Sequence, residues 1–163
     1  MDAVDVIIED PRWDEAGLEE LTERAFAALC SHLGLEAELC EGSVLACDDA
    51  RIKVLNADFR EKDKATNVLS WPAEERATPG ARPPMPEEDF DGTIELGDIA
   101  ISYDTCVREA QEADKPMADH VTHLIVHGLL HLLGYDHISD QDAEIMEGTE
   151  VEILATLGLD DPY

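Results

Sequence analysis

Residues 127–137 read HGLLHLLGYDH, and their three histidines follow the spacing H-x3-H-x5-H. His127 and His131 are four residues apart, so on a helix their side chains project from the same side, about 40° apart around the axis. His137 would point away if the helix continued, but Gly134 can adopt the left-handed conformation that ends a helix and turns the chain back. Three neutral imidazoles with an open fourth position are typical of a catalytic zinc site. The stretch therefore predicts a helix closed by a turn, with His127, His131 and His137 binding one Zn²⁺ per chain.

Gly128 stands where the zinc-protease pattern H-E-x-x-H-x-x-G-x-x-H carries a glutamate. That glutamate takes the proton from the attacking water, so a chain with Gly128 keeps the zinc geometry without the protease chemistry. A glycine inside a helix costs about 1 kcal/mol relative to alanine. Its presence indicates either that another segment approaches the helix backbone there, or that a side chain would block the metal cavity.

Strand and helix patterns follow one another along the rest of the chain. Apolar alternation and short apolar runs predict strands at residues 4–9, one or two within 36–47, and one each at 67–71 and 97–102. Helical spacing and capping residues predict helices at residues 14–33, from Asp48 toward Phe59, at 103–113, at 116–133 and at 139–158. The order predicts a single α+β domain, residues 1–163, with a small mixed sheet covered by helices.

Residues 73–95 differ in composition from the rest of the chain. They hold four prolines, two glycines and several acidic residues, which predicts a mobile surface loop too short to be a domain linker. The loop could close over the site as a lid, but an inert surface loop is the favoured interpretation.

The formal net charge of −28 should repel RNA from the molecule as a whole. Five of the eleven Lys and Arg residues nevertheless fall within one short stretch: Arg51, Lys53, Arg60, Lys62 and Lys64. This stretch is either a local patch that binds a phosphate backbone or a set of solvated cations, and the sequence favours neither.

Compartment and redox state follow from what the sequence lacks. The chain has no apolar run of membrane-spanning length and no basic, apolar leader at its N-terminus, so we expect a soluble cytoplasmic protein without a membrane partner. The four cysteines, in which no pair has C-x-x-C spacing, are expected to be reduced, mostly buried thiols rather than zinc ligands: Cys30, Cys40, Cys47 and Cys106.

Two further stretches complete a recognisable pattern. Residues 55–72, LNADFREKDKATNVLSWP, and residues 96–102, LGDIAIS, precede the histidine stretch. Taken in this order, the three stretches (55–72, 96–102 and 127–137) resemble the sequence blocks of the YbeY endoribonucleases. The resemblance spans roughly residues 45–140. Trp71 stands where Phe is usual, Ala65 where Pro is common, and the insert after Pro72 is longer than expected. None of these departures touches the three histidines.

The resemblance implies a sheet of about four strands with a zincin-like metal helix packed against it. It also implies a single-strand-specific, metal-dependent endoribonuclease that acts in 16S rRNA 3′-end maturation and ribosome quality control. The implied partners are rRNA and the small ribosomal subunit. The acidic surface would suit a basic ribosomal protein, and no DNA partner is expected.

Arg60 is the predicted catalytic cation, because a guanidinium binds phosphate bidentately, stays charged and occupies the arginine position of the family. Substrate contacts are assigned to Lys62, Lys64 and Asn67, with Ser70 helping Asn67 to shape the pocket. Around the ligands, His123 is interpreted as an outer neighbour, and Asp136 either orients a ligand imidazole or caps the turn.

The sequence leaves two alternatives to the endoribonuclease. A zinc peptidase is disfavoured because Gly128 replaces the general base. A non-enzymatic ribosome assembly factor, in which zinc only stabilises the fold, has the same sequence features and differs only in its activity.

Overall fold

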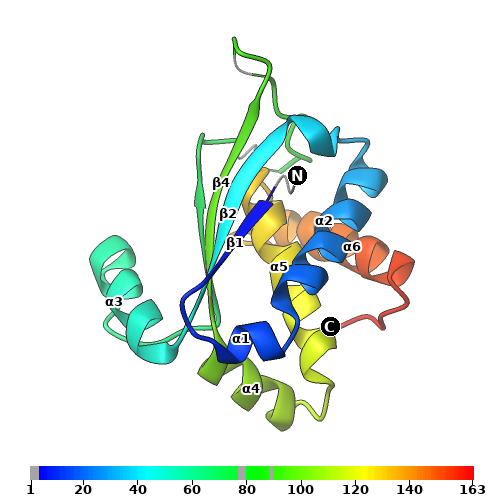
Figure 1. Cartoon of the computed structure of the whole chain (residues 1–163). Coiled ribbons are helices and arrows are strands. Elements are labelled where there is room, and N and C mark those ends of the chain that lie inside the picture. Colours follow the sequence, from blue (N-terminus) through cyan, green and yellow to red (C-terminus); the bar gives the residue numbers. More distant parts are fainter. Residues whose placement is uncertain (1–3, 77–79, 89) are drawn as a thin grey trace.

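The computed structural model describes residues 4–76, 80–88 and 90–163 and shows a mixed sheet with helices on both sides (Figure 1). Four strands form it in the order β1-β2-β4-β3: β1 (Val4–Ile8), β2 (Cys40–Cys47), β3 (Val68–Pro72) and β4 (Ile94–Ser102). β1, β2 and β4 run parallel, and β3 runs antiparallel to β4. The predicted α+β fold with a small four-stranded mixed sheet is confirmed.

Two helical layers flank the sheet. The helices of the described residues are α1 (Arg12–Glu15), α2 (Leu18–Leu33), α3 (Asp49–Arg60), α4 (Tyr103–Glu112), α5 (Met117–Leu132) and α6 (Asp140–Thr156). Figure 1 shows α2, α5 and α6 on one side of the sheet and α3 on the other. Asp48 and Ser139 cap α3 and α6 as predicted, since their side chains accept hydrogen bonds from the backbone N–H groups of Arg51 and Asp142.

The prediction of one helix over residues 14–33 is wrong. Gly17 adopts a left-handed conformation with φ 73° and separates α1 from α2. On the α1 side of this break, Trp13 is fully buried and donates a hydrogen bond from Nε1 to the Cys47 carbonyl at 2.9 Å. Residues 36–47 form a short 3-10 helix (Ala37–Leu39) followed by the single strand β2, and β4 begins at Ile94 rather than Gly97.

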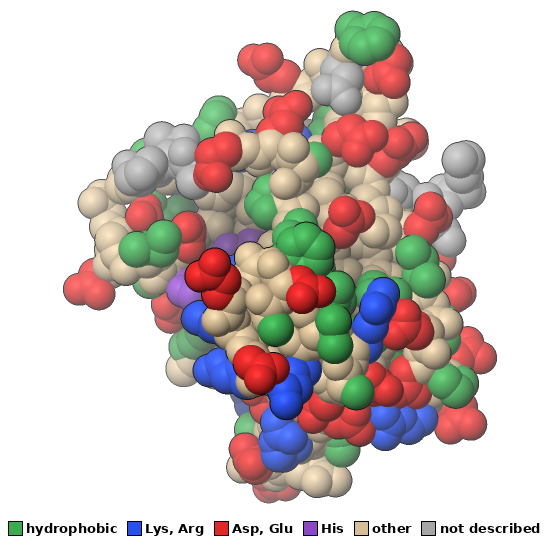
Figure 2. Space-filling view, turned by 90° about the vertical axis from the view of Figure 1, so that its left-hand side faces the viewer, with side chains coloured by type: hydrophobic (Ala, Val, Ile, Leu, Met, Phe, Trp, Pro, Cys, Tyr) green, Lys and Arg blue, Asp and Glu red, His purple; other side chains and the backbone are tan. Residues whose placement is uncertain are grey.

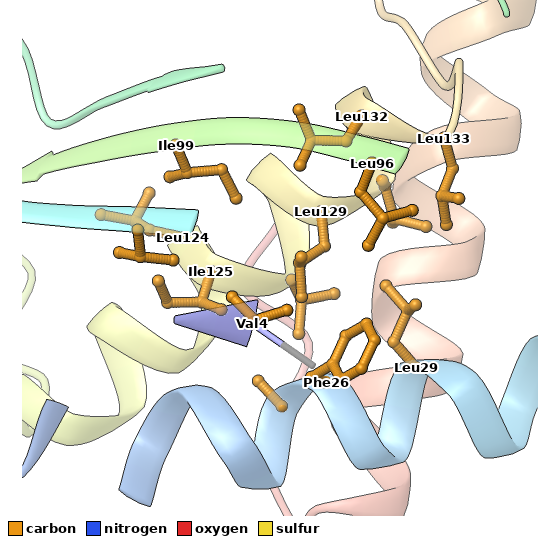
Figure 3. Packing of buried hydrophobic residues seen from close by; sticks show 14 of the residues in the cluster. Val4, Phe26, Leu29, Leu96, Ile99, Leu124, Ile125, Leu129, Leu132 and Leu133 are labelled. Carbon is orange, nitrogen blue, oxygen red and sulfur yellow. The ribbon is translucent and has the colours of Figure 1, made fainter. Parts of the chain in front are cut away.

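The core lies between the sheet and the helical layer that contains α5. The predicted apolar stripe of α5 is buried throughout: Val121, Leu124, Ile125, Leu129 and Leu132. Figure 3 shows Ile99 and Leu96 of β4 facing this stripe, with Phe26 and Leu29 of α2 closing the cluster from the other side. Each fully buried Leu or Ile contributes about 1.5–3 kcal/mol, so α5 is fixed by packing along its whole length.

Gly128 lies on the face of α5 that contacts β3 and β4. A Cβ atom at Gly128 would lie 3.0 Å from Ile99 Cδ1 and 3.3 Å from Ser70 Oγ. Ser70 Oγ also lies 3.5 Å from the Gly128 carbonyl oxygen, to which it donates. Of the two explanations for this glycine, close approach of another segment is therefore the one that the structure shows.

The stretch between β3 and β4 is anchored at two described points, one on α5 and one on α6. The Arg76 side chain is 7% exposed and donates hydrogen bonds to the carbonyl oxygens of Leu132 at 3.0 Å and Glu95 at 2.6 Å. Gly80 donates from its backbone N–H to Asp142 Oδ1 at 2.7 Å. Mobility of residues 73–95 as a whole stays a prediction, and Pro79 lies outside the described residues. Arg76 and Gly80 themselves are bound to α5 and α6.

The four cysteines are buried free thiols, as predicted. Burial raises the pKa of Cys47 to about 12, with a further contribution from the nearby Glu9 carboxylate. Among the described helices, none combines the length and the apolar character that crossing a bilayer requires.

Candidate metal centre

His127, His131 and His137 come together at the end of α5. Their ligand-type nitrogens all lie within 4.8 Å of one another, and the Nε2 atoms of His127 and His131 are 3.0 Å apart. Two nitrogens that each lie 2.0–2.1 Å from a tetrahedral zinc ion are separated by about 3.3 Å. The three side chains therefore have the spacing that one shared cation requires, and they could hold such an ion.

The turn at Gly134 brings His137 back beside the helix. Gly134 has φ 104°, its N–H donates to the His131 carbonyl at 3.0 Å, and the N–H of Tyr135 donates to the Leu130 carbonyl at 3.0 Å. A Cβ atom at Gly134 would lie 2.6 Å from the Arg76 carbonyl oxygen. Glycine is thus required at position 134 for two reasons: the backbone conformation, and the close approach of the backbone at Arg76.

The Nδ1 atoms of two histidines have their own partners. His131 Nδ1 lies 2.9 Å from the Tyr135 carbonyl oxygen, and His127 Nδ1 contacts a carboxylate oxygen of Glu150. Asp136 instead accepts the backbone N–H of His137 at 2.8 Å. This contact is of the turn-capping kind, and the Nδ1 partners of His127 and His131 are other groups; an orienting role for Asp136 stays a prediction.

Glu150 is the residue that the sequence analysis missed. It lies on α6, its side chain is fully buried, and it contacts His123 Nε2 at 3.2 Å, His127 Nδ1 and the Tyr163 hydroxyl. The available signal was a glutamate on the buried face of a helix, between Met146 and Ile153. Since a buried carboxylate needs partners, that position could have pointed to a cationic or hydrogen-bonding neighbour.

Two pKa shifts mark this cluster. Burial, together with repulsion from the neighbouring His127 and His137, lowers the pKa of His131 to about 4. Burial alone would raise the pKa of Glu150, but hydrogen bonds from His123, His127 and Tyr163 outweigh it and hold the pKa at about 2. At neutral pH the cluster therefore presents a neutral His131, as metal binding requires, beside an ionised Glu150.

The outer histidines divide into two kinds. His123 contacts Glu150, and its ring centroid lies 6.2 Å from that of His127, so it is a neighbour of the trio. His123, His127 and Glu150 form a second group whose ligand-type atoms could hold an ion. His120 and His32 pair with other carboxylates, at 3.0 Å from Glu109 and 2.8 Å from Glu152.

The histidine trio opens into a cleft of about 720 Å³, which also receives Arg60, Lys62, Lys64 and Asn67. Arg60 Nη2 donates to the Ser70 carbonyl at 3.1 Å. Asn67 uses its amide elsewhere, because Nδ2 donates to Glu109 at 3.0 Å and Oδ1 accepts from the Val68 N–H at 2.6 Å. All of the side chains predicted for substrate contact thus line one cleft, but the Asn67 amide is already engaged by the protein.

The cleft is cationic on an acidic molecule. Four of the eleven Lys and Arg residues line it, Arg60, Lys62, Lys64 and Arg76, against two carboxylates, Glu75 and Asp136. Figure 2 shows a group of blue side chains beside the visible purple histidine atoms, with red side chains among them and over the rest of this face. The Arg76 guanidinium is bound by carbonyl oxygens, so Arg60, Lys62 and Lys64 are the cations placed to meet an anionic ligand.

This fold and site define a class of small α+β proteins in which a glycine-terminated helix presents a potential three-histidine metal site to a cationic cleft. Comparison with known proteins narrows the class. The chain belongs to the YbeY family, since the family model described as "Endoribonuclease YbeY" matches residues 5–158.

Relatives agree with this assignment, and a solved structure agrees with the fold. Proteins named "Endoribonuclease YbeY" from Ruegeria pomeroyi and Paracoccus denitrificans are 63% and 57% identical to this chain over 98% of its length, and the matches cover 97% and 89% of those proteins. The solution structure of a Thermotoga maritima protein, 21% identical, superposes with a TM-score of 0.57 and covers 95% of this chain and 91% of that one. That structure supports the fold alone.

Proposed function

We propose that this chain is a zinc-dependent endoribonuclease that cleaves single-stranded rRNA during maturation of the 16S rRNA 3′ end and in ribosome quality control. The observation that carries the proposal is the cleft, in which the histidine trio and the three available cations lie together. Membership of the YbeY family supports the endoribonuclease activity. The choice of zinc rests on the three-histidine donor set. The roles of individual residues rest on their positions in the cleft.

His127, His131 and His137 would hold the ion through neutral imidazoles, the donor set of catalytic zinc. When bound, such an ion supplies Lewis acidity and lowers the pKa of water toward about 7. The lowered pKa of His131 keeps this imidazole neutral, so no proton has to be displaced from it at neutral pH.

Arg60 is assigned to the scissile phosphate. Its guanidinium carries five N–H donors, and the Ser70 carbonyl accepts from one nitrogen. The remaining donors can bind two phosphate oxygens in parallel and stabilise the negative charge that develops on them during cleavage. Holding Arg60 against the backbone of β3 fixes this donor set at the wall of the cleft.

Lys62 and Lys64 are assigned to the neighbouring phosphates of the strand. Their loop follows Glu61, which ends α3 in a left-handed conformation with φ 58°. The buried Asn56 fixes the loop, because its carbonyl accepts from the Lys62 N–H at 3.2 Å and its Nδ2 donates to the Lys64 carbonyl at 3.0 Å. The two lysines are therefore presented by an ordered backbone, and their charge favours a polyanion.

The alternatives fit less well. A peptidase would need a carboxylate at position 128, where the side-chain direction meets Ile99 and Ser70 of the sheet. A purely structural zinc protein would need neither an open cleft nor cations beside the trio. Family membership favours the endoribonuclease over both.

The proposed setting is the small ribosomal subunit in the cytoplasm, where the rRNA substrate is found. A net charge of −28 makes the surface outside the cleft unfavourable for bare RNA. The same charge favours contact with a basic ribosomal protein, which could hold the enzyme beside its substrate.

Cleavage of a single-stranded oligonucleotide from the 16S rRNA 3′ region by the purified, zinc-loaded protein tests this proposal. Arg60→Ala should lower the cleavage rate by about 100-fold or more, because removal of one oxyanion donor typically has this effect, while zinc stays at one per chain. Arg51→Ala is the matched control, since Arg51 lies on the same helix but pairs with Glu9 at 3.5 Å. An unchanged rate in Arg60→Ala would remove Arg60 from the mechanism, and a zinc-loaded wild type that leaves RNA intact would favour the assembly factor.

A further inference from the structure

Glu150 shares its two carboxylate oxygens between separate partners. Oε1 contacts His127 Nδ1, whereas Oε2 contacts the Tyr163 hydroxyl and lies 3.2 Å from His123 Nε2. The carboxylate is fully buried at the surface of α6 that faces α5. A buried carboxylate is retained only when hydrogen bonds compensate its charge, and here three side chains provide them.

The contact with His127 determines the state of that imidazole. A carboxylate beside Nδ1 favours a proton on Nδ1, and a neutral ring with its proton there carries its lone pair on Nε2. His127 Nε2 is the atom that lies 3.0 Å from His131 Nε2. Glu150 therefore fixes both the tautomer and the ring orientation in which His127 can donate to an ion at the trio.

Tyr163 fixes Glu150 in turn. Its hydroxyl donates to Glu150 Oε2, its ring lies against that of His123 with centroids 5.6 Å apart, and it lines the same cleft as the trio. Tyr163 is 59% exposed as a residue, so it contributes little to the core. Its closest polar contact is the buried carboxylate behind His127.

We propose that Glu150 is the positioning residue of the metal centre, and that Tyr163 holds Glu150 in this role through its hydroxyl. The inference rests on the metal site of the proposed function and adds the carboxylate–histidine–metal arrangement behind it. Partners of this kind raise the basicity of the ligand imidazole, and their loss typically weakens metal binding by 10- to 100-fold.

The alternative to this hydrogen-bonded arrangement is a second metal ion bound by the same side chains. His123, His127 and Glu150 could hold an ion of their own, but His127 would then have to give up its Nδ1 proton and bridge two cations as an anion. His123 would also have to turn a lone pair from Nε2 toward that ion instead of its contact with Glu150. The hydrogen-bonded arrangement satisfies all of these groups without either change.

Measurements of metal affinity distinguish the hydrogen-bonded Glu150 from a second bound ion. Zn²⁺ dissociation constants, measured by competition with a chromophoric chelator on the full chain, should rise about 10- to 100-fold in Glu150→Gln and by a smaller factor in Tyr163→Phe. Glu152→Gln is the matched control, because it removes a carboxylate–histidine pair from the same helix, that with His32, and it should bind Zn²⁺ like the wild type. The visible absorption of the Co²⁺-loaded protein should change in Glu150→Gln and not in Glu152→Gln, since the donor strength of His127 changes only in the first.

Each outcome has a distinct meaning. Wild-type affinity and an unchanged Co²⁺ spectrum in both Glu150→Gln and Tyr163→Phe would overturn the positioning role. Two Zn²⁺ per wild-type chain, with one lost in Glu150→Gln, would overturn it in favour of the second ion. If Glu150→Gln does not fold, Tyr163→Phe, which removes a single hydroxyl, decides by the same measurement. A wild type that binds no Zn²⁺ or Co²⁺ would instead contradict the metal centre of the proposed function.

Discussion

Gly134 is the residue on which the histidine turn depends. Its φ of 104° lies in the region that L side chains rarely adopt, and the Arg76 carbonyl occupies the place of a Cβ atom. Gly148, in the middle of α6, has nothing within 4 Å of its Cβ position and has no such constraint.

The Gly134→Ala protein should therefore lose at least about 2 kcal/mol of free energy of unfolding, from left-handed strain and overpacking, and should bind Zn²⁺ more weakly. Gly148→Ala should gain about 0.5–1 kcal/mol, because alanine favours the helix. Urea unfolding of both variants measures the difference. Equal stabilities would show that the turn tolerates a side chain.

His131 and Glu150 make the metal-free protein sensitive to acid. The pKa of His131 is lowered from 6.5 to about 4, so between these values the unfolded chain binds more protons than the folded one and stability falls as the pH falls. Glu150 acts in the same direction at lower pH, since its pKa is lowered from 4.5 to about 2.

We expect the free energy of unfolding of the metal-free protein to decrease from pH 6.5 to pH 4, and His131→Gln should flatten that decrease. Urea unfolding at several pH values measures both slopes. The same slope in wild type and His131→Gln would contradict the lowered pKa.

At the scale of elements, α5 is held at its C-terminal end by a segment outside the regular structure. Arg76 donates to carbonyl oxygens of Leu132, at the end of α5, and of Glu95, on β4. Arg82 lies in the same connection and is exposed.

Replacing Arg76 with alanine should lower the free energy of unfolding by about 2–3 kcal/mol, because hydrogen bonds to a charged, buried group are lost. Arg82→Ala should change it by less than about 0.5 kcal/mol. Thermal or urea unfolding compares the two variants. A loss as small as that of Arg82→Ala would show that the connection does not stabilise α5.

The sequence predicted the elements whose signals are local. The stop at Gly134 and the caps at Asp48 and Ser139 depend on neighbouring residues, and so does the histidine spacing. The break at Gly17 was missed, and on its α1 side Trp13 makes a contact with the end of β2, 34 positions away, that no local pattern shows. Glu150 was missed because its partners His123 and His127 lie on another helix and no local pattern joins them.

At the scale of the molecule, charge is distributed unevenly. The chain carries −28 overall, yet the cleft presents Arg60, Lys62 and Lys64. Attraction to a polyanion is therefore local, and repulsion acts over the rest of the surface until counterions screen it.

RNA binding by the protein alone should accordingly be weak at physiological salt in EDTA and should strengthen with Mg²⁺. The double variant Lys62→Gln/Lys64→Gln should weaken it further and lower the slope of log K against log salt by about 1–2. Lys53→Gln/Lys115→Gln, which removes two cations that do not line the cleft, is the control. Tight binding of bare RNA in EDTA would contradict this account of the surface.

The coordination of zinc in the loaded protein tests the central claim most directly. X-ray absorption at the zinc edge, together with metal analysis, should show one ion bound by three imidazole nitrogens at about 2.0–2.1 Å and one oxygen from solvent. His137→Ala should remove one imidazole from that set. A sulfur ligand, four protein ligands around a closed ion, or an unchanged imidazole count in His137→Ala would contradict the open three-histidine site.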